Sequence, residues 1–308
     1  MRTRHGLFTI YSVSVCALFY LQFYPLQQND LHSEYYSHIL AIPLIAAFML
    51  YVERDTFGLQ PPSSCSPGLL FILAGLLVPA FLNLSGIHQG VTGRLALISA
   101  TAIMLWLGGF VWCYGSASLR HTFSPFLFLL FMFPLPPSAM DWVINQLRWG
   151  STVVAAGLFR MGGVPFIREG FVFNLPTLQI EVAQQCSGIR STLALVIIGV
   201  FMSRLALARR VTRLLFYLSI VPVSIAKNGF RIALLSVLGE YGSEKILSDS
   251  WLHHSGGVLF FLLALGLLGG ELWLLRRWET SRLSPHGDKP DGVEAPQRER
   301  FGLTSPEV

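Results

Sequence analysis

A cysteine in a short polar break is the residue of this chain best placed to do chemistry. Cys186 lies in the run Gln-Gln-Cys-Ser-Gly-Ile-Arg-Ser at 184–191, and an apolar stretch over 192–202 follows at once. A thiol is a nucleophile only as the thiolate, and a helix N-terminus and a nearby cation both favour that form. Arg190 lies one turn after Cys186. The pattern therefore predicts a nucleophilic thiol at the head of a helix.

Two further residue types suited to acyl transfer occur later in the chain. Arg231 ends the run Lys-Asn-Gly-Phe-Arg at 227–231 in an otherwise apolar stretch, and His253 and His254 precede the last apolar stretch. Ionisable residues inside membrane segments mark functional sites. Histidine transfers a proton near neutral pH, and arginine stays charged and stabilises an oxyanion. With Cys186 as nucleophile, these residue types predict an acyl-transfer site.

The composition identifies the class of protein that must hold these residues together. Of the 308 residues, 53% are apolar and 13% are charged, whereas a soluble domain carries about 25% charged residues. Repeated apolar runs of about 15–20 residues indicate a polytopic membrane protein. The sequence has no basic, aromatic-rich patch for nucleic acid and no Gly-rich phosphate loop. Its four cysteines lack CxxC spacing, so we predict no zinc site.

The expected fold is an all-α polytopic membrane protein with about eight transmembrane helices. The candidate spans are 7–24, 37–52, 67–84, 95–114, 121–135, 187–203, 212–238 and 256–277. We expect a single membrane domain over residues 1–277. The remaining segment, 278–308, is rich in Pro, Gly and charged residues, which predicts a disordered cytoplasmic tail.

The placement of positive charge predicts the orientation of the helices, because Lys and Arg mark cytoplasmic loops. Arg2 and Arg4 place the N-terminus in the cytoplasm. Arginines crowd the short loop 204–213, and Arg276 and Arg277 close the last span. We therefore expect a multi-pass protein of the cytoplasmic (inner) membrane with both termini in the cytoplasm.

Residues 139–162 are apolar enough to span a membrane but are expected to lie along its outer interface. If this segment crossed, the arginine-rich loop 204–213 would fall outside. Its polar side chains also share one helix face: Asp141, Asn145, Arg148 and Thr152. That spacing predicts an amphipathic helix. The alternating pattern over 164–183, with Pro176-Thr177 at its turn, predicts a small extracytoplasmic β-hairpin.

This orientation brings the candidate residues to one membrane face. Cys186 starts a helix whose inner end is marked by the arginine-rich loop. The next helix rises from Arg213, and at about 1.5 Å per residue Arg231 lies about 27 Å higher. His253 lies just beyond the outer end of the last helix. We therefore predict an active site that faces the extracytoplasmic side.

These residues resemble the sequence blocks of the exosortase/archaeosortase family. Residues 184–191 are similar to its Cys-Ser-Gly-x-Arg-Ser signature, and Asn-Gly-Phe-Arg at 228–231 is similar to its Asn-x-x-Arg block. His-His-Ser-Gly-Gly at 253–257, at the head of the last helix, resembles its His-x-x-x-Gly block. The resemblance covers residues 95–277, which we take as the core of the domain.

The resemblance implies a membrane thiol protease or transpeptidase that processes exported proteins with a PEP-CTERM-like sorting signal. Such a substrate ends in a short Pro-containing motif, a transmembrane helix and a basic end. Cys186 would be the nucleophile, Arg231 the oxyanion stabiliser and His253 the acid/base. Supporting roles fall to a second set: Arg190, Asn228 and His254. A one-residue shift between the two histidines stays open, and so does the acceptor of the acyl group, an amine or water. Substrate and membrane lipid are the implied partners, and no metal or organic cofactor is implied.

A transporter, or a scaffold of an export system without peptidase activity, is the alternative. The many spans favour a transporter, as do the basic residues Lys227 and Arg231 inside a span and the helix-breaking Pro43 and Pro222. Against a transporter, the charges gather at one membrane face instead of the midplane, and the sequence shows no inverted repeat. A scaffold would have no need for Cys186.

Overall fold

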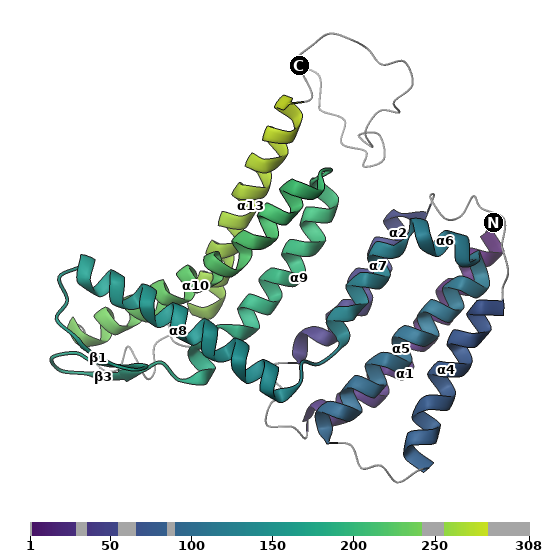
Figure 1. Ribbon diagram of the computed structural model, residues 1–308, viewed down its shortest axis with the longest axis horizontal. Helices are drawn as coiled ribbons and strands as arrows, with labels where there is room; N and C mark the ends of the chain where they lie inside the picture. The colour runs from purple at the N-terminus through teal and green to yellow at the C-terminus, as the bar shows by residue number, and fades with distance from the viewer. Residues whose placement is uncertain (1, 29–35, 55–65, 85–89, 242–255, 283–308) are drawn as a thin grey trace.

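The computed structural model describes residues 2–28, 36–54, 66–84, 90–241 and 256–282, and helices dominate them (Figure 1). The first group of elements is α1 (Arg2–Gln28), the 3-10 turn η2 (Ser37–Ala41), α2 (Ile42–Val52), α4 (Ser66–Leu84) and α5 (Val91–Tyr114). Short pieces follow: α6 (Ser116–His121), α7 (Phe123–Phe128) and η3 (Leu129–Met132). The remaining long helices are α8 (Pro137–Met161), α9 (Ile189–Ala206), α10 (Arg210–Tyr241) and α13 (Gly256–Arg282).

Among the described residues, five helices are long and apolar enough to cross a membrane: Arg4–Leu26, Val91–Tyr114, Ile189–Ala206, Arg210–Tyr241 and Gly257–Ser281. The predicted multi-pass, mainly helical class is therefore confirmed. The predicted count of eight spans is not confirmed, because 37–52 and 67–84 form shorter apolar helices and 121–135 yields only Phe123–Met132. At about 1.5 Å per residue, the helical run His38–Val52 spans about 22 Å, short of the ~30 Å hydrocarbon core. Counting the bent pair Phe123–Met132 and Pro137–Met161 as one span gives a sixth.

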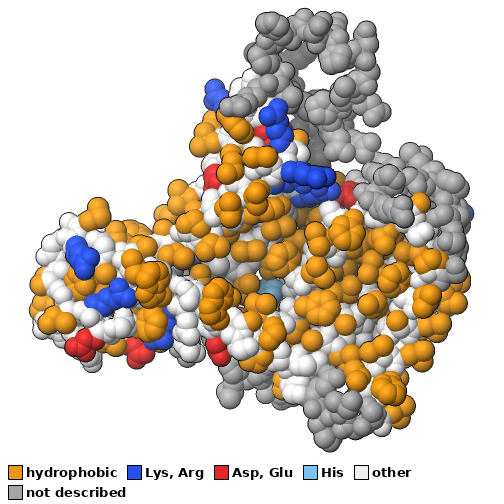
Figure 2. Space-filling view, in the orientation of Figure 1, with side chains coloured by type: hydrophobic (Ala, Val, Ile, Leu, Met, Phe, Trp, Pro, Cys, Tyr) orange, Lys and Arg blue, Asp and Glu red, His pale blue; other side chains and the backbone are white. Residues whose placement is uncertain are grey.

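The apolar side chains divide between protein cores and the outer surface. One core lies where α9, α10 and α13 pack together, and it contains Leu195, Phe216, Ile220, Ala264 and Leu268. An aromatic core joins α1, α5 and α7 through Phe8, Phe110 and Phe126. Large apolar side chains also cover much of the outer surface, as Figure 2 shows. A soluble protein rarely exposes apolar patches of this extent, so this surface suits contact with lipid.

Polar contacts gather the helix ends that the predicted topology puts on one side. Arg204, near the end of α9, donates from Nε to Ser124 Oγ at 2.9 Å, and its Nη2 lies 3.8 Å from Glu53 Oε1, just after α2. Ser124, in the first turn of α7, donates to the same Glu53 oxygen at 3.4 Å. His5, near the start of α1, hydrogen-bonds Tyr114 at the end of α5 at 2.9 Å. These contacts place the end of α9 beside the start of α7 and the end of α2, and the start of α1 beside the end of α5.

A carboxylate from α13 caps the start of α10. Glu279 is only 4% exposed, and its two oxygens accept the backbone N–H groups of Ala208 and Arg209, each at 3.0 Å. The hydroxyl of Thr212 donates to the same carboxylate. N–H groups at a helix start have no partner within the helix, and Glu279 supplies acceptors for the two residues that lead into α10 and for the hydroxyl of Thr212 in its first turn. Residues 278–282, placed by the sequence in the cytoplasmic tail, therefore belong to α13, and 283–308 lie outside the described residues.

Helix α8 turns away from the direction of the preceding segment. It makes an angle of 90° with the helical piece Phe123–Met132, and Figure 1 shows it crossing the lower part of the molecule. Of the predicted polar stripe, Asp141 and Asn145 are exposed, but Thr152 is fully buried. The stripe is therefore not one continuous solvent-facing surface, since its second half packs into protein.

A three-stranded antiparallel sheet follows α8, in the order β1-β2-β3. Its strands are β1 (Ile167–Glu169), β2 (Val172–Asn174) and β3 (Gln179–Glu181). The predicted hairpin is confirmed in β2 and β3, where Phe173 pairs with Ile180 across the Pro176-Thr177 turn. The sequence did not predict β1, because three residues with a single apolar side chain are too few to show alternation.

We expect Glu279→Gln to lower the free energy of unfolding in detergent by about 1–3 kcal/mol, because hydrogen bonds to a charged group are worth roughly this much. Helical circular dichroism followed against temperature or denaturant measures the change. Glu169→Gln, which alters an exposed carboxylate on β1, is the matched control and should leave stability unchanged. Equal stability of the two variants would contradict the capping role of Glu279.

Candidate active site

Cys186 lies in a tight turn at the head of α9. The turn is the 3-10 piece η4 (Gln184–Ser187), and the N–H of Cys186 donates to the carbonyl of Ala183 at 2.9 Å. Gly188 follows with φ +75°, in the left-handed region, and is the N-terminal cap residue of α9. The predicted position of the thiol at the head of a helix is therefore confirmed.

The side chain of Cys186 is half-buried and packs against an apolar cluster, here called the hairpin cluster. This cluster contains Ala155, Ala156, Phe159, Phe173, Leu175, Val182, Ile232 and Ala233. Its members come from α8, from β2 and the residues that follow β2 and β3, and from α10, so three separate parts of the chain meet at the cluster against which the thiol packs. Apolar surroundings lower the local dielectric, which strengthens the effect of any charge near the sulfur.

Asn228 of α10 ties these parts together. It is 2% exposed, and its Nδ2 donates to the carbonyl of Cys186 at 2.8 Å and to Ser151 Oγ on α8 at 3.0 Å. A carboxamide nitrogen carries two protons, and both are used here. The sequence placed Asn228 in a supporting role beside Cys186, and the structure brings the two residues into contact.

A close approach of α8 and α10 makes this contact reachable. A Cβ atom built on Gly229 would lie 2.6 Å from Val154 Cβ and 2.9 Å from the carbonyl oxygen of Ser151. Any larger residue would push the helices apart, because real Cβ atoms do not come this close to neighbouring atoms. Gly229 therefore sets the spacing at which the neighbouring Asn228 reaches Ser151.

The β-hairpin that leads into the Cys186 turn is held at both ends. Arg148 of α8 donates from Nε to the carbonyl of Val182 and from Nη2 to Glu181 at 3.0 Å. Its guanidinium also lies 4.0 Å from the centre of the Phe171 ring, a favourable cation–π contact. At the other end, Glu240 of α10 accepts the N–H of Thr177 at 3.0 Å.

These two clamps were not predicted from the sequence. The sequence predicts Arg148 only as one member of the polar stripe on residues 139–162, and it predicts no role for Glu240. No local signal distinguishes an arginine that faces water from one that holds a strand, because both positions suit an amphipathic helix. The contact depends on where the hairpin folds back.

The other predicted site residues are placed as follows. Arg231 is half-buried on α10, three residues after Asn228 and therefore on the same side of the helix. Arg190 is exposed in the first turn of α9. His253 and His254 lie outside the described residues. The ring of Phe230 packs edge-on against Phe260 near the head of α13, with centroids 6.0 Å apart.

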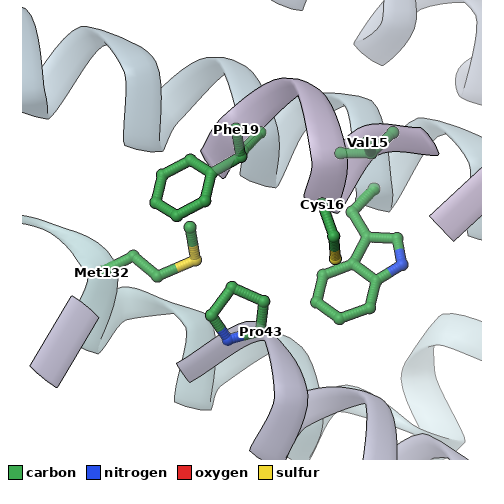
Figure 3. A pocket seen from close by; sticks show the side chains of 7 residues that line it. Val15, Cys16, Phe19, Pro43 and Met132 are labelled. Carbon is green, nitrogen blue, oxygen red and sulfur yellow. The ribbon is translucent and has the colours of Figure 1, made fainter. Parts of the chain in front are cut away.

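The described residues hold no cluster of metal-binding side chains, and the small apolar pocket among them does not include Cys186. Among them, no group of three or more His, Cys, Asp or Glu side chains could hold a metal ion. A small apolar pocket lies among the first helices, with Cys16, Pro43 and Met132 in its wall (Figure 3). The described residues that line this pocket include no histidine and no charged side chain, so the pocket supplies no base to Cys16.

Comparisons with known proteins bear on the part of the chain that carries these residues. The family model of transmembrane exosortases matches residues 28–270. This range includes Cys186, Asn228, Arg231 and the two histidines. Neither the curated proteins nor the solved structures give a match.

Gly188→Ala should distort the turn that carries the thiol. The left-handed backbone costs an L-residue roughly 1–2 kcal/mol, and the added Cβ would lie 3.0 Å from Cγ and Oδ1 of Asn228. We expect lower thermal stability in detergent and an altered rate of Cys186 alkylation by iodoacetamide. Gly266→Ala on α13 is the control, since a Cβ there meets nothing within 4 Å. If Gly188→Ala behaved like this control, the turn would not depend on the conformation described.

Proposed function

The chain belongs to the transmembrane exosortase family, and on this basis we propose that it is a cysteine peptidase or transpeptidase. It cleaves the C-terminal sorting signals of exported proteins through an acyl-enzyme on Cys186. The observation that carries the proposal is the hydrogen bond from Asn228 to the carbonyl of Cys186 at 2.8 Å. This bond joins two sequence blocks, the Cys-Ser-Gly-x-Arg-Ser run and the Asn-x-x-Arg run, at one point of the fold.

The proposed reaction proceeds in two steps. The thiolate of Cys186 attacks the scissile carbonyl carbon, and the electron pair of the C=O bond moves to the oxygen, where Arg231 stabilises the negative charge. The carbonyl then reforms, the C–N bond breaks, and His253 gives a proton to the leaving amine. An amine or water finally attacks the thioester carbonyl and gives a proton to His253, the C–S bond breaks, and Cys186 leaves as the thiolate, which yields attachment or hydrolysis respectively.

The positions of Arg231 and of the head of α13 support this assignment of roles. Arg231 is directly followed in α10 by Ile232 and Ala233, which belong to the hairpin cluster around Cys186. Phe230, which directly precedes Arg231 in α10, contacts Phe260 near the head of α13. The head of α13 therefore lies beside α10 close to Arg231. His253 precedes α13 by three residues in the sequence. Arg190, in the first turn of α9, would add positive potential near the thiolate.

The membrane supplies the second half of substrate recognition in this proposal. The substrate has a PEP-CTERM-like tail, and its transmembrane helix lies in the bilayer, so the Pro-containing motif is held at the level of the site. Trp142 and Trp149 of α8 are 65% and 57% exposed, and tryptophan is enriched at membrane–water interfaces. Helix α8 therefore suits a position along the outer interface of the inner membrane, with Cys186 on the extracytoplasmic side and both termini in the cytoplasm.

We expect Cys186→Ala to abolish processing of a co-expressed, tail-bearing substrate in cells, because the thioester cannot form without the sulfur. Immunoblotting of the precursor and the shortened product measures this. Cys113→Ala, at the end of α5, is the matched control and should process normally. Processing that survives Cys186→Ala would rule out the cysteine mechanism.

The same assay decides between the two histidines. His253→Ala should stop processing, and His254→Ala should leave most of it. The reverse result would move the acid/base role to His254 and leave the nucleophile unchanged.

The orientation predicts which cysteines a membrane-impermeant maleimide reaches in intact cells. A variant whose sole cysteine is Cys186 should be labelled before lysis, because the thiol faces the extracytoplasmic side. A second variant keeps only Cys65, which lies between the predicted spans 37–52 and 67–84, in a loop that the proposed orientation places in the cytoplasm. It should be labelled only after the membrane is opened. A mass shift on a gel reports the labelling of each variant. Labelling of Cys65 in intact cells, with Cys186 labelled only after lysis, would invert the proposed topology.

A further inference from the structure

Lys227 is a buried cation that the proposed reaction does not use. It is 6% exposed on α10, in a helix long and apolar enough to cross a membrane. Among the described residues, no carboxylate forms an ion pair with it. A charge buried without a counter-ion is costly, and ionisable residues inside membrane helices are generally functional. The contacts of its ammonium group therefore indicate what Lys227 does.

These contacts lead to the turn that carries the thiol. Lys227 Nζ donates to Ser191 Oγ in the first turn of α9, and Ser191 Oγ donates to the carbonyl of Gly188 at 2.9 Å. A hydroxyl has one proton and two lone pairs, so Ser191 accepts from the lysine and spends its proton on Gly188. The Gly188 carbonyl also accepts the N–H of Thr192 at 2.9 Å.

Two consecutive residues of α10 thus hold the same turn at two points. Asn228 donates to the carbonyl of Cys186, and Lys227 acts through Ser191 on the carbonyl of Gly188. These carbonyls lie on either side of Ser187. A turn held at one point can rotate about it, whereas two anchors fix its orientation.

We propose that Lys227 is a positioning residue for the nucleophile, acting through Ser191 on the Cys186 turn. The inference rests on the proposed function and deepens it. The buried ammonium supplies a strong donor, the hydroxyl passes the interaction on, and the backbone of residues 186–188 stays in the orientation needed for attack. Preorganisation of this kind acts on the chemical step and not on substrate binding, because the substrate helix docks in the lipid phase.

The test uses the full chain in membranes with a tail-bearing substrate and four variants: Lys227→Met, Ser191→Ala, the double variant and Lys227→Arg. A misplacement of about 1 Å costs about 100-fold in rate, so we expect kcat to fall about 10- to 100-fold in each single variant with KM unchanged. The double variant should be no slower than the slower single one, because both changes break the same chain of hydrogen bonds. Lys227→Arg keeps a cationic donor and should restore part of the rate.

Ser236→Ala is the matched control, since Ser236 is a buried serine of α10 whose hydroxyl donates to Ile232 O within the same helix. It should keep the wild-type kcat. Losses that multiply in the double variant, or a wild-type kcat in Lys227→Met, would overturn the positioning role. Thermal unfolding of each variant in detergent shows whether it is folded.

A second readout separates this inference from the proposed function. The rate of Cys186 alkylation by iodoacetamide in purified protein depends on the turn and not on the substrate. Lys227→Met and Ser191→Ala should change this rate by the same factor, with no further change in the double variant, and a rate equal to wild type would overturn the inference. Cleavage that persists in Cys186→Ala would instead defeat the proposed function, while the alkylation result still decides the role of Lys227.

Discussion

The carboxamide of Asn228 is the interaction on which the described site depends. One of its protons goes to the carbonyl of Cys186 and the other to the hydroxyl of Ser151, so one planar group links α10 to the head of α9 and to α8. Both bonds need a glycine nearby. Gly229 lets α8 and α10 approach, and Gly188 leaves room for the carboxamide beside the turn. Loss of either hydrogen bond would leave a buried polar group unpaired.

Sequence patterns within a short segment correctly predicted those parts of the site that depend only on that segment. The polar break before an apolar run placed Cys186 at the head of a helix, and alternation around Pro176-Thr177 predicted the hairpin. The contact of Asn228 with Ser151 spans 77 residues and depends on how α8 crosses α10. No periodic pattern encodes a crossing point, although the glycine at 229 marks one in retrospect.

The differences between prediction and structure have two physical sources. Hydropathy measures how apolar a segment is but not how far its helix continues. It therefore predicts a full span over 37–52, whereas the segment starts as a 3-10 turn and then forms only α2. The spacing of polar residues in α8 predicts one continuous surface, because side chains that bind protein and side chains that bind water are equally polar. Arg148 belongs to the first kind, since it holds Val182 and Glu181 next to the thiol.

The cap that Glu279 provides has a consequence for the order in which the protein is made. Glu279 comes 70 residues after Arg209 in the chain, so a ribosome has synthesised nearly all of the protein before the amides of Ala208 and Arg209, which lead into α10, find their acceptor. Until α13 is inserted, the helix that carries Asn228 is incomplete at its start. Biogenesis therefore couples the thiol site to the last helix, and a polypeptide truncated before Glu279 would enter the membrane without a fully anchored α10.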